Sequence, residues 1–174
     1  MHRKALGIVV AALLVSAGPV SAQGMKITLG GGVSSPVSDY HDLDSARTGW
    51  MGMLGVTISL PMVGVRLEGL YGENPHEGTN TDKTQLYGGA ASVLVHFPLG
   101  SLSPYLVGSA GYLDHHYSPG DTGAPSSDEW KGVYGGGLGL SFGLAVVDVF
   151  VEGRYLTRST TRFVLGTAGV QIGI

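Results

Sequence analysis

The sequence predicts an all-β protein, an eight-stranded antiparallel up-and-down transmembrane β-barrel. Three patterns predict it: alternation of side-chain type in eight segments, alternation of long and short connections, and aromatic residues at the segment ends. In each segment the apolar residues all fall on one parity, which carries no charged residue, while Lys, Arg, Glu, Ser, Thr and Gln collect on the other. A closed ring of such strands has its apolar side outward, and only lipid makes that arrangement favourable.

The first four expected strands cover about residues 25–34, 49–60, 63–72 and 85–97. Successive strand residues point to opposite faces, so every second residue shares a side of the sheet. The opposite face of the first strand carries Lys26 and Thr28. The outward apolar residues are, strand by strand, Met25, Ile27, Leu29 and Val33; Trp50, Leu54, Val56, Ile58 and Leu60; Val63, Val65, Leu67 and Tyr71; and Tyr87, Ala91, Val93, Val95 and Phe97.

The last four expected strands cover about residues 104–113, 130–144, 147–157 and 163–174. The first of these is the least regular, since Tyr105 and Val107 face inward with Ser109. About five outward positions, tilted by about 40°, rise roughly 25 Å, the height of a lipid-facing band. The outward residues are Leu106, Ala110 and Tyr112; Trp130, Tyr134, Leu138, Leu140, Phe142 and Leu144; Val147, Val149, Val151 and Tyr155; and Val164, Ala168, Val170, Ile172 and Ile174.

The connections alternate in length. Long polar segments at 34–48, 73–84 and 114–129 follow alternate strands, while 61–62, 98–103 and 145–146 are short. Outer-membrane barrels have short periplasmic turns and longer extracellular loops. We therefore expect three long extracellular loops, a short fourth one near 158–161, and both chain ends on the periplasmic side.

Aromatic residues mark both ends of the expected strands. Such placement by depth is typical of the aromatic girdles that flank the lipid-facing band. Six lie outward at the loop ends and two lie outward at the opposite ends: Trp50, Tyr71, Tyr87, Tyr112, Trp130 and Tyr155, then Phe97 and Phe142.

Residues 1–22 have the pattern of a cleaved secretory signal peptide. Arg3 and Lys4 precede an apolar stretch at 5–15, and Val20-Ser21-Ala22 supplies small residues before the cleavage site. Residues 23–174 then form one barrel domain. The chain contains no cysteine, which excludes disulfides, thiol catalysis and lipidation of a processed N-terminus. Its formal net charge of −3 becomes more negative once the signal is removed, which argues against nucleic acid as a partner.

Charged residues of the inward face recur in two similar phrases. Arg66 and Glu68 lie two residues apart, as do Glu152 and Arg154. A lone buried charge is costly, so we expect these four side chains to pair inside the barrel. Lys131 and Asp148 are candidates for the same interior charge network, with Lys26 beside them. The alternative is a proton or ion pathway through the barrel.

No metal site or cofactor is expected. His115 and His116 are adjacent in a loop, so their rings cannot easily face one metal ion. The acidic residues of the first loop lack the glycine-punctuated spacing of a calcium loop. The residues considered are Asp114, His115, His116 and Asp121 in the third loop and Asp39, His41, Asp42 and Asp44 in the first. Inward His96 is assigned to packing or a hydrogen bond.

Catalysis is not expected either. A barrel enzyme that acts on membrane lipid requires a lipid-facing set of Ser, His and acid, because its substrate arrives from the membrane. The outward face of the expected strands contains no Ser, His or acidic residue. A combination of Ser118 with His116 and Asp114 is local in sequence and lies in a loop.

The mature sequence resembles the small outer-membrane barrels of the A and X type (OmpA-like and OmpX-like). The resemblance lies in the eight-strand layout, the phrase at 104–108 (Pro-Tyr-Leu-Val-Gly), the Glu-Gly-x-Tyr phrases at 68–71 and 152–155, and the final strand. It implies a Gram-negative outer membrane with its lipopolysaccharide, and recognition of the last strand by the outer-membrane assembly machinery. Ile174 departs from the aromatic residue that usually ends this strand.

These patterns favour a monomeric, non-enzymatic outer-membrane protein. We expect it to serve envelope integrity, or adhesion through the loops at 34–48, 73–84 and 114–129, with an extracellular ligand that the sequence does not identify. One alternative is a narrow outer-membrane channel. The other is a soluble, lipocalin-like carrier with a reversed arrangement of its two faces, apolar inside and polar outside.

Overall fold

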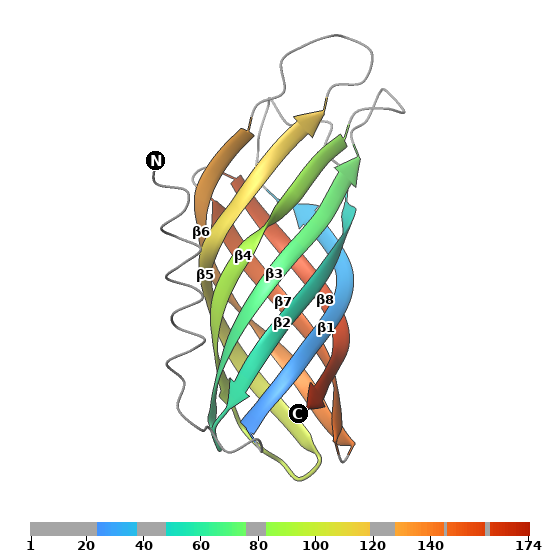
Figure 1. The fold of residues 1–174 in the computed structure, drawn as a ribbon, viewed down its shortest axis with the longest axis vertical. Helices are drawn as coiled ribbons and strands as arrows, with labels where there is room; N and C mark the ends of the chain where they lie inside the picture. The colour runs from blue at the N-terminus through green and yellow to red at the C-terminus, as the bar shows by residue number, and fades with distance from the viewer. Residues whose placement is uncertain (1–23, 38–47, 76–82, 119–127, 145, 159–160) are drawn as a thin grey trace.

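The computed structural model describes residues 24–37, 48–75, 83–118, 128–144, 146–158 and 161–174 (Figure 1). The predicted signal peptide, residues 1–22, lies outside this described part. The strands are β1 (Met25–Pro36), β2 (Gly49–Ser59), β3 (Val63–Pro75), β4 (Lys83–His96), β5 (Leu102–Ser118), β6 (Asp128–Leu144), β7 (Val147–Arg158) and β8 (Thr161–Gly173).

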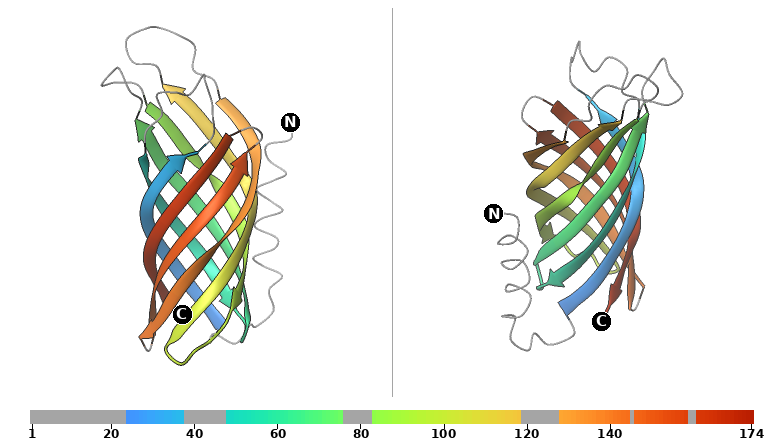
Figure 2. Two further views of the ribbon diagram at one scale, coloured as in Figure 1. Left: turned by 180° about the vertical axis from the view of Figure 1, so that it is seen from behind. Right: turned by 45° about the horizontal axis from the view of Figure 1, so that its top comes forward.

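The eight strands form one closed antiparallel barrel (Figures 1 and 2). Each strand pairs with its neighbour in sequence, and β8 returns to pair with β1. Leu29 of β1, for example, lies opposite Leu54 of β2 on one side and Val170 of β8 on the other. The predicted fold class and strand order are confirmed. No helix in the described ranges is long and apolar enough to cross a membrane.

The two ends of the barrel differ. Short connections join β2 to β3, β4 to β5 and β6 to β7 at the end where the C-terminus lies, which we call the turn end (Figure 1). The opposite end, where the strands flank 38–47, 76–82, 119–127 and 159–160, is called the loop end. All four of those segments lie outside the described residues.

Strands β5 and β6 are longer than predicted, at 17 residues each. Residues 114–118 belong to β5, and 128–129 belong to β6, so the expected loop at 114–129 is partly strand. The physical reason is pairing on both sides. His115 lies opposite Leu86 of β4 and Glu129 of β6, so the ladder hydrogen bonds continue past the point where the apolar alternation stops.

The outward face is apolar across the middle of every strand. Leu54 is 61% exposed and Leu138 is 68% exposed, and every one of the eight strands has large apolar side chains that are exposed. Within the predicted segments the outward face carries no charge, but the strands run further than predicted at the loop end. There the longer strands place Glu73, Asp114 and Arg162 on the outward parity. Charges are tolerated at this level because a strand end lies near the water interface rather than in hydrocarbon.

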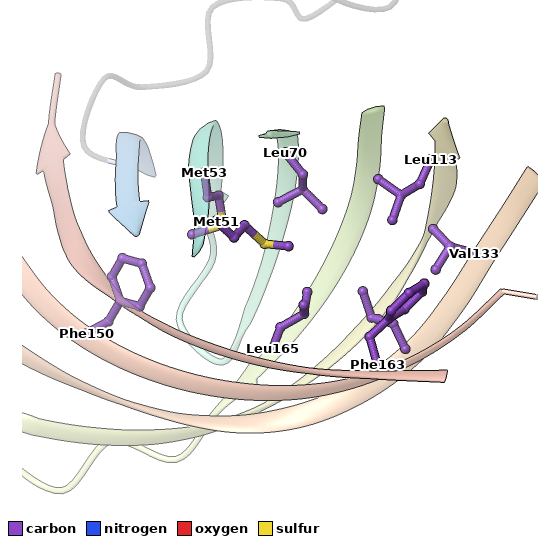
Figure 3. Packing of buried hydrophobic residues seen from close by; sticks show 9 residues of the cluster. Met51, Met53, Leu70, Leu113, Val133, Phe150, Phe163 and Leu165 are labelled. Carbon is purple, nitrogen blue, oxygen red and sulfur yellow. The ribbon is translucent and has the colours of Figure 1, made fainter. Parts of the chain in front are cut away.

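The inward face is not purely polar, which corrects the expectation that all apolar residues share the outward parity. Nine buried apolar side chains pack together inside the barrel, and we call this cluster the apolar plug (Figure 3). Their side chains fill the space because an eight-strand barrel is just wide enough for packed side chains. The plug consists of Met51, Met53, Leu70, Leu113, Val133, Phe150, Leu156, Phe163 and Leu165.

Candidate functional site

Four fully inward charges meet at the centre of the barrel. The Arg66 Nη2 donates to both carboxylate oxygens of Glu152, at 2.8 and 2.9 Å, and its Nε lies 2.9 Å from Glu68 Oε2. The Arg154 Nε lies 2.8 Å from Glu152 Oε1, and Arg154 Nη1 pairs with Glu68 Oε1. Each arginine therefore contacts both glutamates. We call this arrangement the central ion network, and two positive and two negative groups make it formally neutral.

Neutral side chains complete the hydrogen bonding of the two carboxylates. The Tyr105 hydroxyl donates to Glu152 Oε2 at 2.9 Å, and Ser92 Oγ donates to Glu68 Oε1 at 3.0 Å. Ser92 and Ser109 share a further hydrogen bond of 2.8 Å. The sequence placed Tyr105 and Ser109 inward without giving either a role. Both residues share the inward parity of the predicted charges, and this shared parity could have indicated that they contact the central ion network.

A glycine lets Tyr105 reach the network. Register places Tyr105 of β5 opposite Gly139 of β6, and Gly139 opposite Glu152 of β7. The tyrosine ring crosses over Gly139 to reach Glu152, since a Cβ at Gly139 would lie 2.2 Å from Tyr105 Cζ. Absence of a side chain at this position is therefore part of the geometry of the network.

The other two residues proposed for the charge network lie elsewhere. Asp148 pairs with Lys26 near the turn end, where both side chains are partly exposed. Lys131 is half-buried near the loop end, opposite Leu113 of the apolar plug. The structure thus brings Arg66, Glu68, Glu152 and Arg154 together and places Asp148 and Lys131 toward opposite ends.

The central ion network lies against the apolar plug, most of which is on its loop side. Along β3 and β7, Leu70 and Leu156 of the plug follow the network residues toward the loop end. Phe150 of the plug precedes Glu152 on β7, toward the turn end, and the centre of its ring lies 6.0 Å from the Arg66 guanidinium. On the turn side, His96 packs 5.1 Å from the Tyr105 ring and its Nδ1 lies 3.4 Å from Ser103 Oγ. These contacts suit the packing role assigned to His96.

The outward face carries aromatic and polar contacts near the loop end. The rings of Trp50 and Tyr71 lie 5.6 Å apart at an angle of 56°. The Tyr71 hydroxyl donates to Glu73 at 3.3 Å, and the Tyr87 hydroxyl donates to Asp114 at 2.8 Å. Apolar rings and hydroxyl groups of this kind suit the boundary between hydrocarbon and water.

The remaining residues proposed for the girdles are distributed as follows. Tyr112 and Tyr155 are exposed on the outward face, and Phe97 and Phe142 are exposed near the turn end. Trp130 is the first predicted outward residue of β6, and its side chain lies outside the described part. Tyr134 of β6 is a further exposed outward aromatic residue.

The loop residues weighed as metal ligands lie mostly beyond the described chain. Asp39, His41, Asp42, Asp44 and Asp121 fall in such segments. His115 and His116 belong to β5 rather than to a loop, and Asp114 is buried. Within the described residues, no three His, Asp or Glu side chains gather as a metal site.

The closed ring of eight antiparallel strands, with tight turns at one end and an apolar outward belt, defines the fold of the small outer-membrane β-barrels. No protein-family model and no curated protein matches the sequence. Solved structures do resemble it. Neisserial surface protein A (NspA) superposes with a TM-score of 0.68 at 18% identity, over 87% of this chain and 97% of that one.

Two further structures have the same fold. Ail, the attachment invasion locus protein of Yersinia pestis, matches with a TM-score of 0.63 at 17% identity, over 86% of this chain and 98% of that one. The N-terminal β-barrel domain of Pseudomonas aeruginosa OprF matches with a TM-score of 0.52 at 14% identity, over 86% of this chain and 97% of that one. At sequence identities this low, the similarity shows a shared fold and nothing further.

Proposed function

We propose that this chain is a non-enzymatic protein of the bacterial outer membrane. It would reach that membrane after a signal peptide, residues 1–22, is cleaved. One observation supports this most directly. Large apolar side chains are exposed on all eight strands while the charges of Arg66, Glu68 and Glu152 are buried. In water this arrangement would leave the apolar belt solvated, whereas a bilayer covers it.

The interior supports a closed stalk rather than an open channel. A pore needs a continuous watery path, but here the neutral central ion network and the apolar plug fill the centre of the barrel. We therefore place the biological role in the segments 34–48, 73–84 and 114–129, which would face the cell exterior and serve envelope integrity or adhesion.

The charge of these segments narrows the class of adhesion partner. Acidic residues outnumber basic ones in each, with Asp39, Asp42 and Asp44 against Arg47 in the first. Ail has been solved with the heparin analogue sucrose octasulfate, a polyanion. An acidic loop surface instead favours a neutral or basic partner. Binding of folded vesicles to immobilised polylysine and to heparin tests this, and preference for heparin would contradict it.

The membrane assignment is tested by folding the mature chain into lipid vesicles and comparing gel mobility before and after boiling. A folded barrel migrates differently from the boiled chain and resists protease across its strands. A chain that stays in solution without detergent, shows no shift and binds a fluorescent fatty acid would instead be a lipocalin-like carrier.

Conductance separates the closed stalk from the channel. Planar bilayers that contain the folded chain should show no steady single-channel current. Regular current steps, with a size that scales with salt concentration, would overturn the closed interior.

A further inference from the structure

An exposed apolar groove of about 670 Å³ crosses the outward face of β1, β8, β7 and β6. Figure 2, left, shows β7, β8 and β1 side by side at the front. Gly153 lies opposite Gly166, and Gly31 lies opposite Ala168, so small residues form a continuous floor. The side chains beside it stand higher and are more than half exposed: Val33, Leu138 and Val151.

A positively charged side chain, that of Arg162, lies toward the loop end of this groove. Arg162 of β8 has the same outward parity as Gly166 and is exposed, with Val164 between them. Arg162 and Gly166 are four positions apart on the strand, which corresponds to about 13 Å. Among the outward side chains that the structure describes, Arg162 is the only basic one. No described carboxylate pairs with it.

A second groove provides a contrast within the same chain. It has a volume of about 800 Å³ and is floored by Gly52 and Gly69, on β2 and β3. Its loop end is acidic, because the Glu73 carboxylate lies there, hydrogen-bonded to the Tyr71 hydroxyl. The two grooves therefore have similar apolar floors and opposite charges at the loop end.

We propose that the groove below Arg162 holds an acyl chain of a phosphorylated, multiply acylated glycolipid of the outer leaflet, a lipid of the lipid A class, and that Arg162 binds its phosphate. An arginine fork matches a phosphate and forms charge-assisted hydrogen bonds with it. The acyl chain lies over the glycine floor, where side-chain bulk is missing. The inference rests on the proposed function, since it requires the loop end to face the outer leaflet.

The test measures lipid that stays bound to the full mature chain, released from neutral phosphatidylcholine nanodiscs that contain equal small amounts of lipid A and phosphatidylglycerol. Native mass spectrometry identifies the retained lipid. We expect the wild-type chain to retain lipid A in preference to both phospholipids. Equal retention of lipid A and phosphatidylglycerol would overturn the choice of occupant.

Two substitutions examine the two halves of the site. Gly153→Leu fills the groove, and Arg162→Gln removes the cation; each should reduce retained lipid A about tenfold, the loss expected for one charge-assisted hydrogen bond or a buried apolar contact of similar strength. Arg162→Lys should restore part of the binding.

Matched controls exist for both. Gly108 is also an outward glycine, and a Cβ at Gly108 or Gly153 would meet nothing within 4 Å, so Gly108→Leu adds the same bulk outside the groove. Glu73→Gln removes an outward charge at the other groove. Both controls should retain lipid A like the wild type. If Gly153→Leu and Arg162→Gln retain lipid A like the two controls, while each variant keeps its heat-dependent gel shift, the site is wrong and the membrane assignment stands. Loss of the shift in the wild type would refute the membrane assignment itself.

Discussion

At the scale of single residues, the crossing of Tyr105 over Gly139 determines how the central ion network is supported. Gly139→Ala places a Cβ 2.2 Å from the tyrosine ring, so the ring has to move and its hydrogen bond to Glu152 is lost. We expect the free energy of unfolding to fall by about 1–3 kcal/mol, the usual cost of overpacking. Urea titration of the barrel in lipid vesicles measures this change.

Gly153→Ala is the control for that substitution. Its added methyl group meets nothing within 4 Å and points outward. The midpoint of urea unfolding of this control should equal that of the wild type or lie slightly above it, since alanine reduces the conformational freedom of the unfolded chain. Equal effects of the two substitutions would mean that the position of Tyr105 does not depend on the missing side chain at Gly139.

A second prediction concerns the charge balance of the central ion network. Arg66→Met leaves Arg154 alone between two buried carboxylates, Glu68 and Glu152. Removal of one partner from a buried ion pair costs about 3–5 kcal/mol, because the remaining charge is left uncompensated. Urea unfolding in vesicles should therefore shift strongly for this variant.

The double variant Arg66→Met with Glu152→Gln checks the cause of that loss. It returns the network to formal neutrality, so it should be more stable than Arg66→Met alone although it lacks one more charge. This non-additivity is the signature of a direct interaction. Purely additive losses would show that Arg66 acts by packing against Phe150 rather than by its charge.

At the scale of elements, the alternation of side chains was sufficient to predict eight strands and their outward faces, because lipid admits few polar groups in the middle of a strand. It was not sufficient for the interior. Phe150 and Leu165 occupy inward positions because a dry, narrow barrel accepts any side chain that packs. Strand length was also missed. Asp114 and His115 suit a loop as well as a strand, and the pairing partners on both sides decide between them.

The extension of β5 gives a third prediction. Amide hydrogens at 114–118 should exchange with solvent slowly, like those of the other paired strands, because this segment pairs with β4 and its first part also pairs with β6. Hydrogen-exchange mass spectrometry of the barrel in nanodiscs resolves the segment. Exchange as fast as in the unfolded chain would return residues 114–118 to the loop that the sequence alone predicts.

At the scale of the whole molecule, the exposed apolar belt distinguishes a membrane barrel from a soluble carrier. The sequence left both arrangements open, since either parity could face inward. Burial of Arg66 and Arg154 together with exposure of Leu54 and Leu138 favours the membrane. The two assignments predict opposite effects of a new charge on this belt. The charge destabilises a barrel whose belt faces lipid, whereas it is harmless on a belt that faces water.

Leu138→Arg puts this difference to the test with Leu99→Arg as its partner. Both leucines are 68% exposed, but Leu138 lies in the middle of β6 and Leu99 lies in the connection between β4 and β5. Arginine on the lipid face costs about 2–4 kcal/mol near the midplane and about 0–1 near the interface. Urea unfolding in vesicles should therefore be shifted by Leu138→Arg and nearly unchanged by Leu99→Arg. Because exposure is matched, a soluble carrier would tolerate both substitutions equally, and that result would reverse the assignment of the two faces.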